Sequence, residues 1–201
     1  MNRSELKNPS YITKAQHVCL KKGGADAVEQ SAPFKAVNKP PEVENGDIKY
    51  RQFLGEGYYF WDDNEQMAHI WGNHRCEGTY FITETEIYIG IDWCFDLVGC
   101  RPHLKLLKHA IERYESDRKR KVCIGECIEL LKQIKSEKDE SFQIKIIRAV
   151  DDYVTDNYNP STVNFVENFK HTMKLDPKIS LCVIDKIVLL RPISITYSSK
   201  N

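Results

Sequence analysis

The sequence predicts a single α+β domain, and three observations lead to this prediction. Residues 80–91 alternate between apolar and polar side chains, and residues 179–197 form a strongly apolar run, as β-strands do. Residues 102–135 instead carry apolar residues at helical spacing, which predicts two amphipathic helices. The 201 residues can bury one substantial core, so we expect one domain over 1–201 with a helical insertion at about 102–155.

The N-terminal part is predicted to hold a short helix and a long loop. Residues 13–22 begin with a potential N-cap, Thr13, and are followed by Gly23 and Gly24, which is typical of a helix that ends at a glycine C-cap. Residues 25–49 contain three prolines and show no periodicity. We therefore expect a loop there, and long loops in compact domains often cover a ligand site.

The rest of the chain is predicted to alternate between strands and helices. The expected elements are a turn leading into a strand at 50–60, a helix capped by Asn64 at 64–72, one bent strand or two strands at 80–91, two helices at 102–135, a helix at 144–154, and one or two strands at 179–197. Periodicity does not separate helix from strand at 144–154, where we favour a helix.

Charge and cysteine content indicate a cytoplasmic protein. The chain carries 29 acidic and 29 basic residues, so its net charge gives no broad attraction to nucleic acid or to an anionic membrane. It has no stretch that resembles a signal peptide and no apolar window of about 18 residues. Seven cysteines, an odd number set among apolar neighbours, indicate reduced thiols.

Zinc binding is the less favoured interpretation of the histidines and cysteines. His69, His74 and Cys76 lie close together in the sequence, but no pair with C-x2-C spacing is present. Cys123 and Cys127 lie four residues apart on an apolar helix face, where buried thiols are the commoner explanation. We expect no metal.

Residues 54–72, LGEGYYFWDDNEQMAHIWG, carry the most specific pattern in the chain. Gly55, Gly57, Tyr59 and Phe60 match the Gly-x-Gly-x-Tyr-Phe strand of the ADP-ribosyltransferase fold, as in poly(ADP-ribose) polymerases and the diphtheria-toxin-like group. The stretch also resembles bacterial proteins in which this strand reads Leu-Gly-x-Gly-x-Tyr-Phe-Trp. The alternative interpretation is purely structural: the glycines form a tight turn or bulge, and the aromatic residues after it fill the core.

The resemblance implies a split mixed sheet with a helical insertion and a site for NAD as substrate. Cleavage of NAD builds positive charge on the ribose, so the site must hold the nicotinamide ring and place a carboxylate near the sugar. Tyr59 would stack on the nicotinamide, and Tyr11 or Thr13 would hold the ribose. The remaining residues expected to bind NAD are Gly55, Gly57, Phe60, Trp71 and Ser180, with the glycines allowing close backbone approach.

The expected activity is transfer of ADP-ribose from NAD to an unknown acceptor, with Tyr59 and Glu167 as catalytic residues. Two positions depart from the family: Tyr11 or Thr13 stands where the family has histidine or arginine, and Ser180 stands at the position of the catalytic glutamate. Other candidate carboxylates are Glu140, Glu56 and Asp62. These departures leave open a second interpretation, a binding module that keeps the fold without catalysis.

Overall fold

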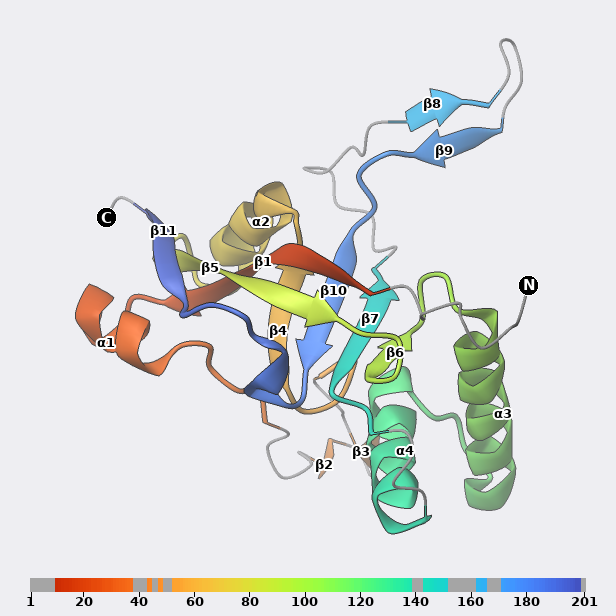
Figure 1. The fold of residues 1–201 in the computed structure, drawn as a ribbon. Helices are drawn as coiled ribbons and strands as arrows, with labels where there is room; N and C mark the ends of the chain where they lie inside the picture. The colour runs from red at the N-terminus through yellow and green to blue at the C-terminus, as the bar shows by residue number, and fades with distance from the viewer. Residues whose placement is uncertain are drawn as a thin grey trace.

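The computed structural model describes residues 10–37, 43–44, 47–48, 52–138, 143–151, 162–165 and 171–199. Over these residues the chain is an α+β protein with four α-helices, a mixed seven-stranded sheet and small two-stranded sheets (Figure 1). The main sheet holds strands from both ends of the chain, since the strand order is β11–β5–β1–β4–β10–β7–β6. The first strand, β1, therefore lies in the interior of the sheet, next to the central strand β4.

The strands of the main sheet are β1 (Tyr11–Leu20), β4 (Tyr58–Asp62), β5 (Tyr80–Ile89), β6 (Cys94–Asp96), β7 (Ile146–Val150), β10 (Ile179–Val183) and β11 (Ser194–Ser198). Strands β6 and β7 are parallel, and the other neighbours pair antiparallel. The small sheets pair β2 (Val43–Glu44) with β3 (Asp47–Ile48) and β8 (Thr162–Asn164) with β9 (Thr172–Lys174). The β8–β9 pair extends away from the main sheet (Figure 1).

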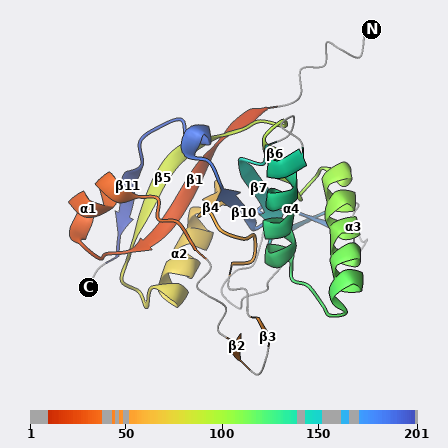
Figure 2. The ribbon, with the colours of Figure 1, turned by 90° about the horizontal axis from the view of Figure 1, so that it is seen from below.

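The helices are α1 (Gly24–Ser31), α2 (Glu65–Arg75), α3 (Arg101–Arg118) and α4 (Ile124–Lys138), and a short 3-10 helix, η2, covers Lys186–Val188. Helices α3 and α4 lie side by side at the β6–β7 end of the sheet (Figures 1 and 2). Helix α2 lies towards the other end, where it contacts β1 and β5.

Each face of the main sheet has its own cover. Successive side chains of a strand point to opposite faces, so Tyr59 and Trp61 share one face and Phe60 lies on the other. Trp61 belongs to a buried cluster with Met67 of α2, and Tyr59 packs on a cluster that includes Ile128 of α4. Phe60 packs on the opposite face in a third cluster. Helices α2 and α4 therefore cover the same face of the sheet.

The sheet opens between β1 and β4. Strand β1 pairs with β5 along its full length, but it pairs with β4 only at Ala15–Asp62 and Gln16–Trp61. Strand β4 meanwhile pairs with β10 from Tyr58 to Trp61. Beyond those two shared pairs, β1 still pairs with β5 and β4 still pairs with β10, but β1 and β4 no longer pair with each other. The two strands therefore share only a short stretch of pairing, and we call the point where it ends the split in the main sheet.

The prediction of a helix at 13–22 is wrong, because residues 13–20 belong to β1 and the last two residues follow the strand. A strand with neighbours on both sides and covers on both faces loses the apolar–polar alternation that identifies a half-buried strand. Ala15, Gln16 and His17 are buried in succession and show this effect. The terminal Gly23 and Gly24 belong to a turn and to the start of α1, both with positive φ.

Two further predictions are corrected and two are confirmed. The predicted loop at 25–49 contains most of α1, and the described part of the helix favoured at 144–154 holds the strand β7 instead, which lies between β10 and β6. Among the described residues, the helical block of the predicted insertion therefore ends with α4. The cap of α2 is confirmed, since the Asn64 side chain accepts a hydrogen bond of 2.9 Å from the Met67 backbone N–H. The two helices predicted at 102–135 are α3 and α4.

The seven cysteines form no disulfide; Cys123 is exposed and the other six are buried or half-buried. Among the residues that the structure describes, no helix is both long and apolar enough to span a membrane.

Candidate functional site

A cavity of about 890 Å³ lies at the split between β1 and β4. Pockets for small molecules and cofactors typically measure roughly 300–1,000 Å³. It is lined by residues 16–20 of β1, 59–61 of β4, the segments 34–36 and 52–53, the end of α2, Lys22 and Ser180. Side chains from both faces of the sheet contribute because the two strands separate there.

His17 bridges the split in the sheet. Its Nδ1 lies 2.8 Å from the backbone oxygen of Tyr59, and its Nε2 accepts a hydrogen bond of 3.3 Å from the backbone N–H of Phe34. The ring is almost fully buried, and this burial lowers the pKa of His17 from its ordinary value. His17 therefore joins β1, β4 and the segment 34–36 as a neutral imidazole.

Sequence reasoning missed His17. A lone histidine inside a segment expected to be helical matched no motif. The signal that could have identified it is its place in Ala-Gln-His-Val-Cys, a stretch without Lys, Arg, Asp or Glu that a central strand also accommodates.

Aromatic side chains form much of the cavity wall. Trp71 of α2 packs edge-on against Trp61 of β4, with ring centroids 6.1 Å apart. Phe53 and Tyr59 form a second aromatic pair, with centroids 5.1 Å apart. Both pairs line the cavity, together with Phe34 and Phe60. Such walls suit flat aromatic ligands, because rings stack or meet edge to face with little loss of entropy.

The charge of the cavity is positive. Lys22, Lys35 and Arg75 line it, and none of the described residues that line it is an aspartate or glutamate. The Arg75 guanidinium lies 5.1 Å from the Trp71 ring centroid, so a cation and an aromatic face lie side by side. The cavity is suited to a ligand that combines an aromatic ring with negative charge.

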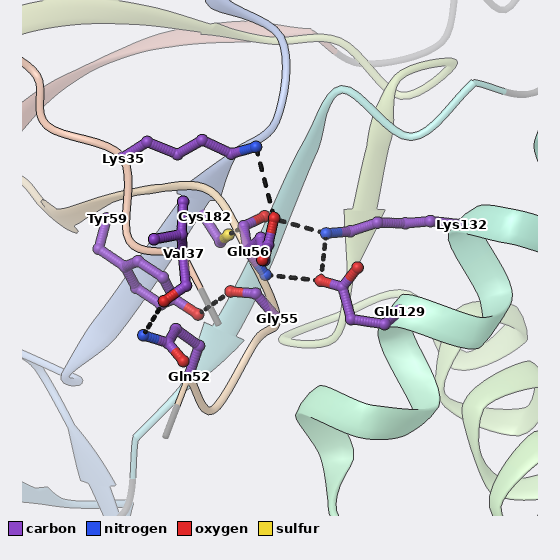
Figure 3. A network of polar contacts seen from close by, with 9 residues as sticks. All are labelled: Lys35, Val37, Gln52, Gly55, Glu56, Tyr59, Glu129, Lys132 and Cys182. Carbon is purple, nitrogen blue, oxygen red and sulfur yellow. Dashed lines mark hydrogen bonds and ion pairs between the residues drawn. The ribbon is translucent and has the colours of Figure 1, made fainter. Parts of the chain in front are cut away.

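Tyr59 lines the cavity, and its hydroxyl is hydrogen-bonded to the backbone of the preceding turn. The hydroxyl donates a 2.6 Å hydrogen bond to the backbone oxygen of Gly55 (Figure 3). It accepts a second hydrogen bond of 3.0 Å from the Leu54 N–H. Burial raises the pKa of this phenol well above its ordinary value. Tyr59 can therefore supply a stacking surface but is not placed as a proton donor or acceptor for a ligand.

Gly55 and Gly57 do not line the cavity, although the sequence predicts them as ligand contacts. Gly55 has a φ of +80°, and a Cβ atom there would lie 2.2 Å from the Glu129 carboxylate. A Cβ atom on Gly57 would lie 2.4 Å from the Cys182 sulfur. The glycines allow the turn to pack closely on α4 and on β10, so their physical role is internal packing.

Tyr11 and Thr13 lie in the other half of β1 and do not line the cavity. Thr13 donates a 2.6 Å hydrogen bond to the carboxylate of Asp62, which also forms an ion pair of 2.9 Å with Arg148. The ring of Tyr11 lies over Arg148 at 5.9 Å. The part of β1 that lines this cavity is 16–20, so the residues predicted to hold the ribose lie outside it.

The predicted carboxylates lie outside the cavity or outside the described residues. Glu56 forms an ion pair of 3.5 Å with Lys35, and Asp62 is held by Arg148; neither lines the cavity. Glu140 and Glu167 lie outside the described residues. Ser180 lines the cavity and is buried, directly opposite Trp61 in the pairing of β10 with β4.

In the described ranges, no group of three or more His, Cys, Asp or Glu side chains could hold a metal ion. Comparison with family models, curated proteins and solved structures found no match to this chain.

Proposed function

We propose that the cavity binds NAD and that the chain is an ADP-ribosyltransferase-like protein. The observation that carries this proposal is the composition of the cavity wall: paired aromatic rings, three cations and, among the described residues, no carboxylate. NAD has two flat heterocycles joined through two negatively charged phosphates. An aromatic, positively charged cavity at a split sheet matches that combination better than it matches a neutral or cationic ligand.

The parts of the wall suit different parts of NAD. Tyr59 offers a face on which the nicotinamide ring can stack, and Trp71 offers one for the adenine ring. Arg75 and Lys22 offer N–H groups for the diphosphate, whereas Lys35 is already paired with Glu56; Arg75 can bind two oxygens of one phosphate at once. Because Tyr59 and Trp71 lie on β4 and α2, the ligand would span the space between these elements.

Transfer of ADP-ribose is the second candidate function. The family resemblance aligns Ser180, a buried residue of the cavity wall, with the catalytic glutamate, so the position reaches the cavity but the serine itself argues against transfer. Cleavage of the nicotinamide–ribose bond needs a carboxylate to stabilise the cationic sugar. A serine hydroxyl carries no charge, so Glu167 remains the proposed source of that carboxylate. Binding of NAD therefore ranks first, and transfer second.

The test is calorimetric titration of the purified chain with NAD and, separately, a time course of nicotinamide release. Trp71→Ala and Arg75→Ala should each weaken NAD binding by about tenfold, the size expected for loss of one stacking or ionic contact. Lys105→Ala is the matched control, because Lys105 is exposed on α3 away from the cavity.

The outcomes separate the candidates. If NAD at up to about 1 mM does not bind, the proposed function is wrong, because that limit corresponds to only about 4 kcal/mol. Binding without release of nicotinamide supports the binding module. Release that Glu167→Gln abolishes supports transfer.

A further inference from the structure

Residues 52–57, which we call the glycine turn, contact helix α4 through a compact network of polar groups (Figure 3). The Glu129 carboxylate accepts a 2.5 Å hydrogen bond from the backbone N–H of Glu56. The Lys132 ammonium donates to the backbone oxygen of Glu56 at 2.9 Å and to Glu129 at 2.7 Å. Both peptide groups on either side of the Glu56 side chain are thus held by one turn of α4.

The fit between α4 and the turn is close enough to fix their relative position. A Cβ atom on Gly125 of α4 would lie 2.1 Å from the backbone oxygen of Gln52 and 3.3 Å from the backbone N of Gly55. The Glu129 and Lys132 side chains are only 25% and 17% exposed, so water screens their contacts only partly. The network is therefore a stiff connection and not a chance pairing at the surface.

The same turn holds Tyr59. The phenol hydroxyl bonds to Leu54 and Gly55, the two residues that precede Glu56, and Tyr59 itself lines the cavity. A shift of the turn would move both hydroxyl partners and reorient the ring. Contacts thus run without a gap from α4 through the turn to one wall of the cavity (Figure 3).

We infer that Glu129 is a positioning residue for the NAD site: with Lys132, it holds the glycine turn so that the Tyr59 ring faces the ligand. This inference rests on the proposed function and assigns a role to the helical block, which contributes no residue to the cavity wall among the described residues. Glu129 acts through the turn, so its loss changes binding at the Tyr59 wall and leaves the Trp71 and Arg75 wall intact.

The experiment compares Glu129→Ala with wild type in titrations with NAD and with ADP-ribose, which lacks the nicotinamide ring. We expect about a tenfold weaker NAD affinity and less than about a threefold change for ADP-ribose, because one stacking contact is disturbed. Glu129→Gln keeps an oxygen acceptor and should restore most of the NAD affinity. In a Tyr59→Phe background, where the hydroxyl is already absent, Glu129→Ala should add less than about a twofold change.

Hydrogen exchange of the Glu56 backbone amide reports on its hydrogen bond to Glu129 without any ligand. The exchange rate of this amide should rise in Glu129→Ala. Glu112→Ala, which removes an exposed carboxylate of α3, is the matched control and should change neither readout. If Glu129→Ala fails to fold, Lys132→Met replaces it in these experiments, because it removes the hydrogen bond from Lys132 to the Glu56 backbone oxygen.

The results distinguish this inference from the proposed function. Wild type that binds neither ligand overturns the proposed function and this inference with it. Wild type that binds NAD, beside a Glu129→Ala protein that binds NAD equally well, overturns only the positioning role. Equal weakening of NAD and ADP-ribose, not rescued by Glu129→Gln, also overturns it, since that result indicates general destabilisation.

Discussion

The imidazole of His17 lies 2.8 Å from the backbone oxygen of Tyr59, at the point where β1 and β4 stop pairing. A carbonyl oxygen can only accept, so His17 Nδ1 carries the proton and Nε2 is left to accept from the Phe34 N–H. One neutral tautomer therefore satisfies both contacts. A doubly protonated ring would place Nε2–H against the N–H of Phe34 and lose that hydrogen bond.

Stability should fall as the pH drops below about 6.5, the ordinary pKa of histidine. Burial lowers the pKa of His17 in the folded state, so below that pH the unfolded chain binds a proton that the folded chain does not. The stabilisation is present above the unfolded pKa and is lost on acidification, with a slope of at most about 1.4 kcal/mol per pH unit for one proton. Urea unfolding at pH 5 and at pH 7.5 measures the change.

His17→Gln should be less stable than wild type at pH 7.5 and should lose less stability on acidification. His109→Gln is the control, because His109 lies exposed on α3. An equal loss in wild type and in His17→Gln would show that other groups account for the acid sensitivity.

Ser180→Glu should raise nicotinamide release from NAD by at least about tenfold over wild type. The substitution places a carboxylate in the cavity at the position where the family resemblance expects one, and such a group stabilises positive charge that develops on the ribose. Ser180→Gln has nearly the same shape without the charge and should stay at the wild-type rate. Equal rates for the Glu and Gln variants would mean that Ser180 does not face the reacting sugar.

The elements that the sequence predicts correctly depend on local signals. Asn64 caps α2 through a residue three positions away, and the apolar spacing of α3 and α4 repeats within each helix. Strand β1 has no such signal, because its burial on both faces comes from segments far away in the chain. Thr13 is a good helix-cap residue, but this local preference carries no information about the distant segments that bury β1.

The site was partly predictable for the same reason. Tyr59, Phe60 and Trp71 belong to one continuous motif and all reach the cavity, as does Ser180. The role of Gly55 was not predictable, since its neighbour Glu129 lies 74 positions further along the chain. A glycine that approaches a ligand and one that approaches a helix look identical in sequence.

Asn64→Ala should cost about 1 kcal/mol of stability, the usual effect of losing an N-cap side chain. The Asn64 oxygen accepts from the Met67 N–H in the first turn of α2, the helix that carries Trp71 and Arg75. Chemical denaturation measures the cost. Asn73→Ala is the matched control, because Asn73 is exposed inside the same helix, where alanine is the better helix former. A cost for Asn73→Ala equal to that for Asn64→Ala would argue against the cap.

Gly55→Ala should destabilise the chain more than Gly24→Ala does. Both glycines have a φ near +80°, so alanine pays a similar backbone cost of roughly 1–2 kcal/mol at each site. A new Cβ meets nothing within 4 Å at Gly24, whereas at Gly55 it meets the Glu129 carboxylate. Denaturation of both variants isolates that clash. Repeating Gly55→Ala in a Glu129→Ala background should remove the excess cost, and an excess that persists would place the conflict in the backbone of the turn.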